Sequence, residues 1–579
     1  MWKYIKKYSI FGIMAAMFMV LEVLMDLLQP EIMSKIVDNG VLGVNNNGVG
    51  NIDIIWKYGL LMICLVLFGG LCGSLNNAFV HITSQNTGND MRKDIFRKIM
   101  TFSFSEIENF GTGSLIVRVT NDITQVEHFV ALFIRSIVRT FMLIFGSIFF
   151  MFRLNYTFGI IVLTILPFII GWLIFCIKRA NPFFIKLQLQ LDKINDILQE
   201  DISGIRMIKA CVREVYEKFR FGKANDELIK TQLKVLIIFV FMNPVINVLM
   251  YVVITLLLLV GSYQVQNNFT TPGLIMAAIT YTTQLLHGIL NLVMIFQNIS
   301  RGFVSWKRIK ETLQIEPKIK SGSFFGRANT FGKIEFKDVS FAYPGSKREV
   351  LKNINLTILP GETVAIMGST GCGKTSLVNL IPRFYDVTKG KILIDDIDVK
   401  EYALQALREK ISIVLQNSEL FNASIEENIL FGSPNADFEA IKKAATIAQG
   451  DKFISETIDG YKTIVAERGV SLSGGQKQRI SIARAILKSS NILIFDDSTS
   501  ALDLKTEAEL YKALQESNSN ITKIIVAQRV ASVRNADRII ILEGGKIIAS
   551  GSHDELINTC HSYIDIYNSQ LGEGGECSA

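Results

Sequence analysis

The segment Gly368–Thr375, GSTGCGKT, has the G-x-x-x-x-G-K-[ST] spacing that binds phosphate groups. It follows the apolar stretch TVAIM, which predicts a strand, and precedes SLVNLIPRFY, which predicts a helix. The glycines allow backbone N–H groups to turn toward phosphates, the helix N-terminus adds a favourable dipole, and Lys374 reaches the terminal phosphates. The sequence therefore predicts an ATP site formed by one continuous segment, with these members: Gly368, Ser369, Thr370, Gly371, Cys372, Gly373, Lys374, Thr375 and Ser376.

A second candidate group is the pair of adjacent aspartates in NILIFDD. Asp496 closes the apolar run ILIF, a position from which a carboxylate holds Mg²⁺ through its ligand shell. The Thr375 hydroxyl is a second ligand for the same ion. Asp497 follows directly.

The elements that position these residues lie in the second half of the chain. The segments KIEFKDVSF, VAIMG, ISIVLQ, NILIFD and KIIVAQ predict strands, and RIIILEGGKIIASG predicts a hairpin turning at Gly-Gly. This composition is that of a soluble α/β nucleotide-binding domain. We place its boundaries at 333–571, after a Gly- and Ser-containing linker at 321–332 and before a tail at 572–579.

The first 320 residues have a different character. With 49% hydrophobic and 20% charged residues, the whole chain is too apolar for an ordinary soluble protein of 579 residues. Six apolar stretches are long enough to span a bilayer, which predicts an all-α membrane domain of six helices at 1–320; they lie at 9–30, 57–82, 129–152, 157–178, 235–262 and 272–300.

Charge follows the same division. The connections after the second and fourth stretches are long and basic, and the others are short and nearly free of Lys and Arg, so the positive-inside rule places both termini and both long loops in the cytoplasm. The net charge of +7 is explained by these loops, and no basic helix with interleaved aromatics indicates a nucleic-acid partner. The seven cysteines show no spacing typical of a disulfide framework or a zinc site.

SLSGGQKQR at Ser471–Arg479 contains LSGGQ, and with it the chain resembles the ATP-binding cassette (ABC) proteins. Other cassette motifs fall in order around it. Tyr343 resembles the aromatic residue that stacks on adenine, Gln416 the Q-loop glutamine that contacts Mg²⁺, Glu467–Gly469 the exporter loop that contacts the coupling helices, and Ser500–Asp503 the D-loop. Six spans followed by one cassette are similar to an exporter half-transporter, in particular the degenerate-site subunit of bacterial heterodimeric multidrug exporters.

The resemblance implies a dimer in the plasma membrane. In that family two cassettes enclose two ATP molecules, each between the P-loop of one subunit and the LSGGQ of the other. It therefore implies that this chain pairs with a second half-transporter, exports small amphipathic molecules, and completes its partner's ATP site with four signature residues: Ser473, Gly474, Gly475 and Gln476.

Two residues depart from the family pattern. Asp497 stands where active members have glutamate, and Gln528 in VAQRV stands where they have a switch histidine. Shortening a carboxylate side chain by one methylene withdraws it by about 1 Å, and a misplacement of that size can cost roughly a hundredfold in rate. A glutamine donates a hydrogen bond but does not carry a proton as an imidazole does. We expect this chain's own site to bind ATP and hydrolyse it poorly; the alternatives are a slow homodimer in which Asp497 suffices and an ATP-gated channel or regulatory subunit.

Charged residues inside the spans are candidates for the transport pathway. Glu22 and Asp26 lie four residues apart in the first span, and Arg135 and Arg139 repeat this spacing in the third. Either the acids attract cationic substrates from a central cavity, or acids and arginines neutralise one another within the bundle. His287 in the sixth span lines a polar pathway or makes an interhelical hydrogen bond.

Overall fold

The protein is described by a computed structural model covering residues 1–44, 48–326, 331–346, 348–466, 469, 471–517 and 520–572, without the side chains at 293, 294, 296–298, 300, 571 and 572. The chain divides into two compact units, one of Met1–Met100 and Gly113–Ile315 and the other of Thr101–Thr112 and Glu316–Ala579. The short segment Thr101–Thr112 thus belongs with the C-terminal unit although its sequence neighbours belong to the N-terminal one.

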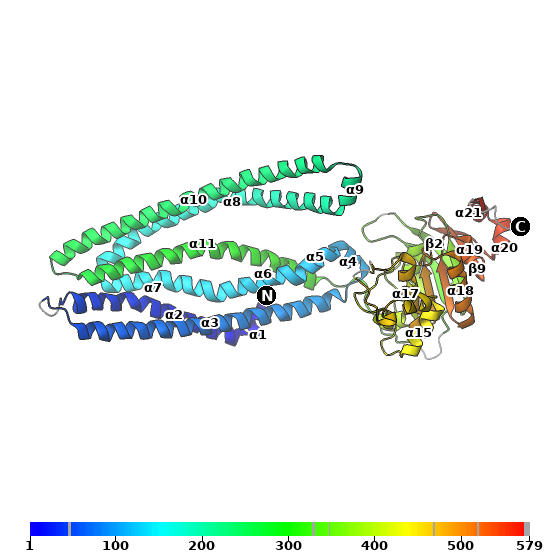
Figure 1. The fold of residues 1–579 in the computed structure, drawn as a ribbon, viewed down its shortest axis with the longest axis horizontal. Coiled ribbons are helices and arrows are strands. Elements are labelled where there is room, and N and C mark those ends of the chain that lie inside the picture. Colours follow the sequence, from blue (N-terminus) through cyan, green and yellow to red (C-terminus); the bar gives the residue numbers. More distant parts are fainter. Residues whose placement is uncertain are drawn as a thin grey trace. The chain divides into compact units, whose positions relative to one another are not determined.

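The N-terminal unit is a bundle of long helices (Figure 1). The described residues contain six helices long and apolar enough to cross a membrane, which confirms the six predicted spans. The long helices are α2 (Ser9–Lys35), α3 (Ile52–Ile99), α7 (Val138–Leu154), α8 (Tyr156–Ser203), α10 (Glu214–Gln266) and α11 (Pro272–Gln314). Shorter helical pieces are α1 (Trp2–Lys7), α5 (Thr112–Val117), α6 (Ile123–Leu132) and α9 (Ile205–Ala210), and π-helical turns are η1 (Ile36–Val41), η2 (Arg118–Asp122) and η3 (Phe133–Ile137).

Helix α11 is fixed to the rest of the bundle by polar contacts at both ends. At its N-terminus the carboxylate of Asp38, on η1, accepts hydrogen bonds from the Gly273 N–H at 2.7 Å and the Thr271 hydroxyl at 2.6 Å. The bond from Gly273 satisfies one of the backbone donors that the first turn of a helix leaves unpaired. Near its other end Ser305 donates to Asp122 of η2 at 2.8 Å. In the middle of the helix the Tyr281 hydroxyl donates to the Leu27 carbonyl at 2.6 Å, so α11 is held against α2 and the α5–α7 segment along its length.

The C-terminal unit contains two sheets. The antiparallel sheet has the order β2 (Leu351–Ile358), β1 (Ile334–Phe341), β4 (Lys389–Ile394) and β5 (Ile397–Asp398). The other sheet has the order β10 (Lys546–Gly551), β9 (Arg538–Glu543), β3 (Thr363–Met367), β8 (Thr522–Val526), β7 (Ile492–Asp496) and β6 (Ile411–Val414). All its strands are parallel except β10, which forms a hairpin with β9.

Both faces of the parallel sheet are buried, which explains the uninterrupted apolar runs of its strands. One face packs on the antiparallel sheet in a core that includes Phe336, Ile366 and Ile494, and the other face packs on helices in a core that includes Ala365, Phe495 and Ile480. The helices of this unit are α4 (Phe104–Phe110), α12 (Lys374–Leu380), α13 (Leu404–Glu409), α14 (Ile425–Leu430), α15 (Phe438–Ile447), α16 (Asp451–Ser455), the 3₁₀ turn η4 (Gly460–Lys462), α17 (Gly474–Leu487), α18 (Leu504–Ser517), α19 (Val530–Val533), α20 (His553–Thr559) and α21 (His561–Gly572).

Two local predictions have different outcomes. The hairpin turn is confirmed, because Gly544 and Gly545 both adopt positive φ, at 55° and 82°, between β9 and β10. The helix predicted over 376–385 is wrong in its second half, since α12 begins at Lys374 and ends at Leu380. Ile381 still has helical dihedral angles, but Pro382 has no backbone N–H and cannot donate the next hydrogen bond of the helix, which ends it early.

Helix α4 is the part of the N-terminal half that packs within the C-terminal unit. The Phe104 ring lies 4.7 Å from the Phe384 ring, centroid to centroid, and the Tyr385 hydroxyl donates to the Glu108 carboxylate at 2.8 Å. Phe384 and Tyr385 lie four and five residues after Leu380, the last residue of α12, so α4 contacts the segment that continues from the phosphate-binding turn.

Candidate functional site

The candidate site is built at the carboxyl ends of neighbouring parallel strands, where ligands of open α/β sheets bind. β3 leads into the glycine-rich turn, β7 ends at Asp496, β8 is followed by Gln528, and β6 is followed by Gln416. The register pairs Asp496 with Val526 and Val526 with Ile366, so these strand ends lie at the same level. The sheet therefore brings together residues from four separate segments of the sequence, between Gly368 and Gln528.

The turn between β3 and α12 has the backbone geometry of an anion cradle. Gly368, Gly371 and Gly373 adopt φ values of 149°, 82° and 106°, in the region that favours glycine. The Lys374 ammonium donates to the carbonyls of Gly368 at 2.8 Å and Ser369 at 3.0 Å and is almost fully buried. The predicted nucleotide-binding residues fall in two groups, the turn Gly368, Ser369, Thr370, Gly371, Cys372 and Gly373, and the first turn of α12 with Lys374, Thr375 and Ser376.

Replacing Gly368 tests this cradle. A Cβ at Gly368 would lie 2.1 Å from the Leu542 carbonyl oxygen, a backbone atom of β9 that cannot move aside, whereas a Cβ at Gly371 meets no atom within 4 Å. We expect Gly368→Ala to lower the unfolding temperature of the full chain and to abolish ATP binding, because strain of this kind costs about 1–3 kcal/mol before the clash is added. Gly371→Ala is the control, because it introduces the backbone strain of a positive φ without a steric clash. Equal unfolding temperatures for the two variants, measured with and without ATP, contradict this account.

The residues predicted to hold Mg²⁺ lie beside the turn. The Thr375 hydroxyl donates to the Asp496 carboxylate at 2.9 Å, which holds these two oxygen ligands together. Burial raises the pKa of Asp496, and the neighbouring Asp497 adds to this, while the bond from Thr375 and the charge of Lys374 oppose it. Hydroxyl and carboxylate oxygens are the ligands that Mg²⁺ prefers, and the ion usually takes the rest from phosphates and water. The residues present fit Mg²⁺ bound together with ATP.

Asp497 occupies an unusual position in this site. It has φ 48°, a left-handed conformation that is uncommon for residues other than glycine. Its Oδ2 accepts a hydrogen bond from the Gln528 amide at 2.9 Å and a longer one from the Gln416 amide at 3.4 Å. The structure therefore brings together the two residues that depart from the family pattern, with the Q-loop glutamine beside them.

Tyr343 lies next to the turn in the same unit. Its hydroxyl is hydrogen-bonded to the Ser376 hydroxyl at 2.8 Å, and its half-buried ring packs edge-on against Phe341 and Tyr385 at centroid distances of 4.9 and 5.3 Å. That its ring stacks on adenine stays a prediction.

The signature segment begins α17. Ser473 caps this helix, with its hydroxyl accepting from the Gln476 N–H at 3.3 Å and the Gln476 side chain accepting from the Ser473 N–H at 2.8 Å. Ser473 and Gly474 are exposed, and a Cβ on Gly475 would lie 3.0 Å from the Ala501 carbonyl oxygen of the D-loop. Within the described part of the chain no hydrogen bond or ion pair joins Ser473, Gly474, Gly475 or Gln476 to the turn 368–376, so one chain presents the two halves of an ATP site without joining them.

Glu467 and Arg468 of the predicted coupling loop lie outside the described residues.

Two further residues hold the site in place and were not anticipated. Arg529 donates to the carbonyls of Leu502 at 3.1 Å and Ser500 at 3.1 Å, which ties the segment after β8 to the D-loop. The amide side chain of Gln570, in α21, accepts from the Val530 N–H at 2.8 Å and donates to the Gln528 carbonyl at 2.7 Å. Arg529 is the next residue after Gln528, and this adjacency could have pointed to it, whereas Gln570 is 42 residues from Gln528 and nothing in the sequence indicates its role.

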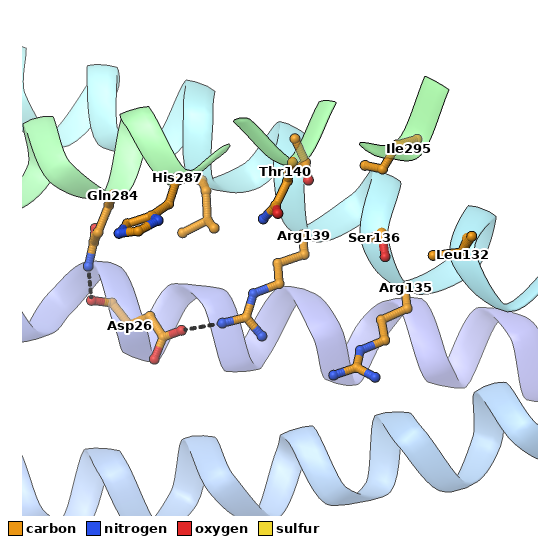
Figure 2. A pocket seen from close by; sticks show the side chains of 11 residues that line it. Asp26, Leu132, Arg135, Ser136, Arg139, Thr140, Gln284, His287 and Ile295 are labelled. Atoms are coloured by element: carbon orange, nitrogen blue, oxygen red, sulfur yellow. Dashed lines mark hydrogen bonds and ion pairs between the residues drawn. The ribbon is translucent and has the colours of Figure 1, made fainter. Parts of the chain in front are cut away.

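Of the five candidate pathway residues, Glu22, Asp26 and Arg139 form an ion-pair cluster, and Arg135 and His287 lie outside it. Arg139 of α7 bonds Glu22 at 2.8 Å and Asp26 at 3.4 Å, both on α2, which agrees with the reading in which acids and arginines pair within the bundle. Figure 2 shows the bond to Asp26. Arg135 and His287 line the same cavity as Asp26 and Arg139 and, among the described residues, have no hydrogen-bond or ion-pair partner.

Comparisons with known proteins agree along the whole chain. The model of the ABC transporter transmembrane region matches residues 12–289, and that of the ABC transporter domain matches residues 351–500. The chain is 37% identical over 573 residues to the uncharacterised ABC transporter ATP-binding protein YfiB of Bacillus subtilis, covering 99% of this chain and 98% of the relative. It is 33% identical over 524 residues to the ATP-dependent lipid A-core flippase of Syntrophus aciditrophicus, covering 90% and 87%. Among solved structures, a bacterial Atm1-family ABC exporter with ATP bound is similar with a TM-score of 0.80 and 25% identity, over 96% of this chain and 99% of that one.

Proposed function

Because the chain belongs to the ABC transporter family and has the layout of an exporter half-transporter, we propose that it is one subunit of a heterodimer whose two ATP sites are unequal. Its own P-loop, with Asp497 and Gln528, forms the site that binds ATP and hydrolyses it poorly. Its signature residues complete the competent site on the partner subunit. Both cassettes lie in the cytoplasm, and the complex exports small amphipathic molecules across the plasma membrane.

The surroundings of Asp497 carry this proposal. A catalytic base must have a free oxygen that accepts a proton from the attacking water. Asp497 already accepts two amide hydrogen bonds on Oδ2, from Gln528 and Gln416, so this oxygen is engaged by the protein and the short side chain is held between the two glutamines. The shorter side chain and the engaged oxygen both hinder Asp497 from taking a proton from the attacking water. Both therefore support slow hydrolysis at this site.

The signature segment supports the second half of the proposal. Its helix cap is complete, and its glycines leave an exposed backbone at the N-terminus of α17, a position that favours phosphate binding. Nothing in its sequence departs from LSGGQ. A chain with an impaired acid and an intact signature is suited to serve catalysis on another subunit.

Orientation and cargo follow from other observations. The basic connections place the cassette in the cytoplasm by the positive-inside rule. Several relatives are named ATP-dependent lipid A-core flippases, and a lipid cargo in these relatives favours an amphipathic cargo for the present chain.

The ATPase rate of this chain purified alone in lipid tests the proposal, after ATP binding has been confirmed. We expect binding with a rate near background, and a rate at least tenfold higher when a second half-transporter with glutamate and histidine at the corresponding positions is co-expressed. A robust rate from the chain alone, lost in Lys374→Ala, overturns the heterodimer and makes Asp497 a working acid in a homodimer. Substrate flux that depends on ATP binding without any turnover, in either preparation, identifies instead a channel or regulatory subunit.

A further inference from the structure

The N-terminal unit contains a cavity of about 560 Å³ between α2, the η3–α7 segment and α11. Its lining mixes apolar side chains with charged and polar ones, as expected of a site for an amphiphile. The apolar members include Leu132, Leu143 and Ile295, and the charged or ionisable members are Asp26, Arg135, Arg139 and His287 (Figure 2).

Most of the charge in this cavity is already paired. Arg139 bonds Glu22 through one guanidinium nitrogen and Asp26 through the other, and Glu22 is mostly buried, with 16% of its side chain exposed. Gln284 donates to the backbone carbonyl of Asp26 at 3.2 Å, which fixes α2 and α11 at this level. The acids therefore serve the bundle and are engaged by a cation that the protein itself supplies.

Arg135 is the charged side chain that this pairing leaves over. It is exposed, it stands one turn before Arg139, and no described residue pairs with it. It is the middle residue of η3, and π-helical turns within helices frequently mark functional sites. A guanidinium binds phosphate and carboxylate oxygens with two parallel hydrogen bonds, and in a membrane-embedded cavity an unpaired one is a functional candidate by default.

The depth of Arg135 agrees with a headgroup site. It precedes Leu154, the last residue of α7, by 19 positions, which corresponds to about 28 Å along a helix. The hydrocarbon core of a bilayer is about 30 Å thick, so Arg135 lies near the opposite border of the membrane from the α7–α8 turn. Apolar cavity residues such as Leu143 lie nearer the middle of the span, where acyl chains are expected.

We propose that this cavity binds an amphiphile with an anionic headgroup, a phosphate, sulfate or carboxylate, and that Arg135 is the residue that binds the charge. His287 is a second donor in the same cavity. This inference rests on the proposed function as an exporter and deepens it by naming the charge of the cargo. The reading in which Glu22 and Asp26 attract a cationic cargo is its competitor, because these two carboxylates share the single positive charge of Arg139.

Equilibrium binding of two fluorescent probes to the full chain in phosphatidylcholine nanodiscs tests the proposal. The probes share a labelled dodecyl tail and carry either a phosphate or a trimethylammonium head. We expect the phosphate probe to bind more tightly and Arg135→Gln to weaken it at least tenfold. Arg153→Gln, at the other end of α7 and outside the cavity, is the matched control and leaves the affinity within twofold. Since Arg135 contacts no described partner, its replacement is not expected to unfold the bundle.

Three results overturn the proposal. They are an unchanged affinity of the phosphate probe in Arg135→Gln, tighter binding of the trimethylammonium probe that is lost in Asp26→Asn, and displacement of the phosphate probe by an equal concentration of inorganic phosphate, which identifies a soluble anion. None of these readings uses ATP turnover. Failure of the headgroup site is therefore distinct from failure of the heterodimer, which the ATPase rate of the chain alone decides.

Discussion

Asp497→Glu combined with Gln528→His is expected to raise ATP turnover at this chain's own site by about a hundredfold. The glutamate restores the methylene that a shorter side chain lacks, and a shift of about 1 Å is worth roughly that factor. The histidine removes the amide that now donates to Asp497 Oδ2 at 2.9 Å and supplies a group that carries a proton. The measurement is the ATPase rate of a complex in which the partner's own P-loop has been inactivated, so that only this site contributes.

The single variants separate the two contributions. Asp497→Glu alone is expected to raise the ATP turnover rate at least tenfold. Gln528→His alone is expected to change this rate little, because a switch residue cannot compensate for a misplaced base. Asp497→Asn is the isosteric control. If the native site is already nearly silent, Asp497→Asn changes its rate less than about threefold, whereas a loss of a hundredfold or more would mean that Asp497 is a competent base as it stands.

The parts of the candidate cassette site could be identified from the sequence because each part is local. The glycine-rich turn follows one strand, Asp496 ends another, and each carries its function in the residues immediately around it. The arrangement of the strands that unites them follows the rule that parallel strand ends meet at one edge, and the register of β3, β8 and β7 agrees with that rule.

Contacts between distant segments could not be predicted in the same way. Spacing alone left open whether Arg135 and Arg139 act together, since both stand one turn apart on one helix. The structure separates them, because only Arg139 faces two acids across the α2–α7 interface. Gln570, which holds the backbone around Gln528 from α21, gave no signal in the sequence, because a glutamine near a helix end is common and usually solvated.

The packing of α4 is a second example. Phe104 and Glu108 lie in a short helix between two membrane spans, and nothing in their spacing indicates that they contact Phe384 and Tyr385. An aromatic pair of this kind stabilises the fold by about 0.5–1.5 kcal/mol beyond the burial of its rings. Which rings form the pair depends on long-range packing and cannot be predicted from their local sequence. Local motifs thus identify the chemistry, and long-range packing decides which of the charged or aromatic candidates are structural.

Replacing Gly475 is expected to inactivate the assembled transporter, while replacing Lys374 is not. A side chain at Gly475 meets the Ala501 carbonyl oxygen at 3.0 Å and covers the backbone at the start of α17 that faces the partner's nucleotide in the proposed heterodimer. Gly475→Gln should therefore lower the ATPase rate of the complex by roughly a hundredfold or more, since one group that stabilises transferring phosphate is worth about this factor.

Lys374→Ala acts on the other site. It removes the cation that bonds Gly368 and Ser369 and that would face the phosphates, so this chain's own nucleotide should be lost while the partner's site keeps its full set of groups. We expect the rate of the complex to fall less than about tenfold, since binding at the silent site supports closure of the dimer without supplying chemistry. The measurements are the ATPase rate and the number of bound nucleotides per complex for each variant. Equal losses of rate in the two variants would show two equivalent sites, because only an unequal pair makes one chain's signature indispensable and its P-loop lysine nearly dispensable.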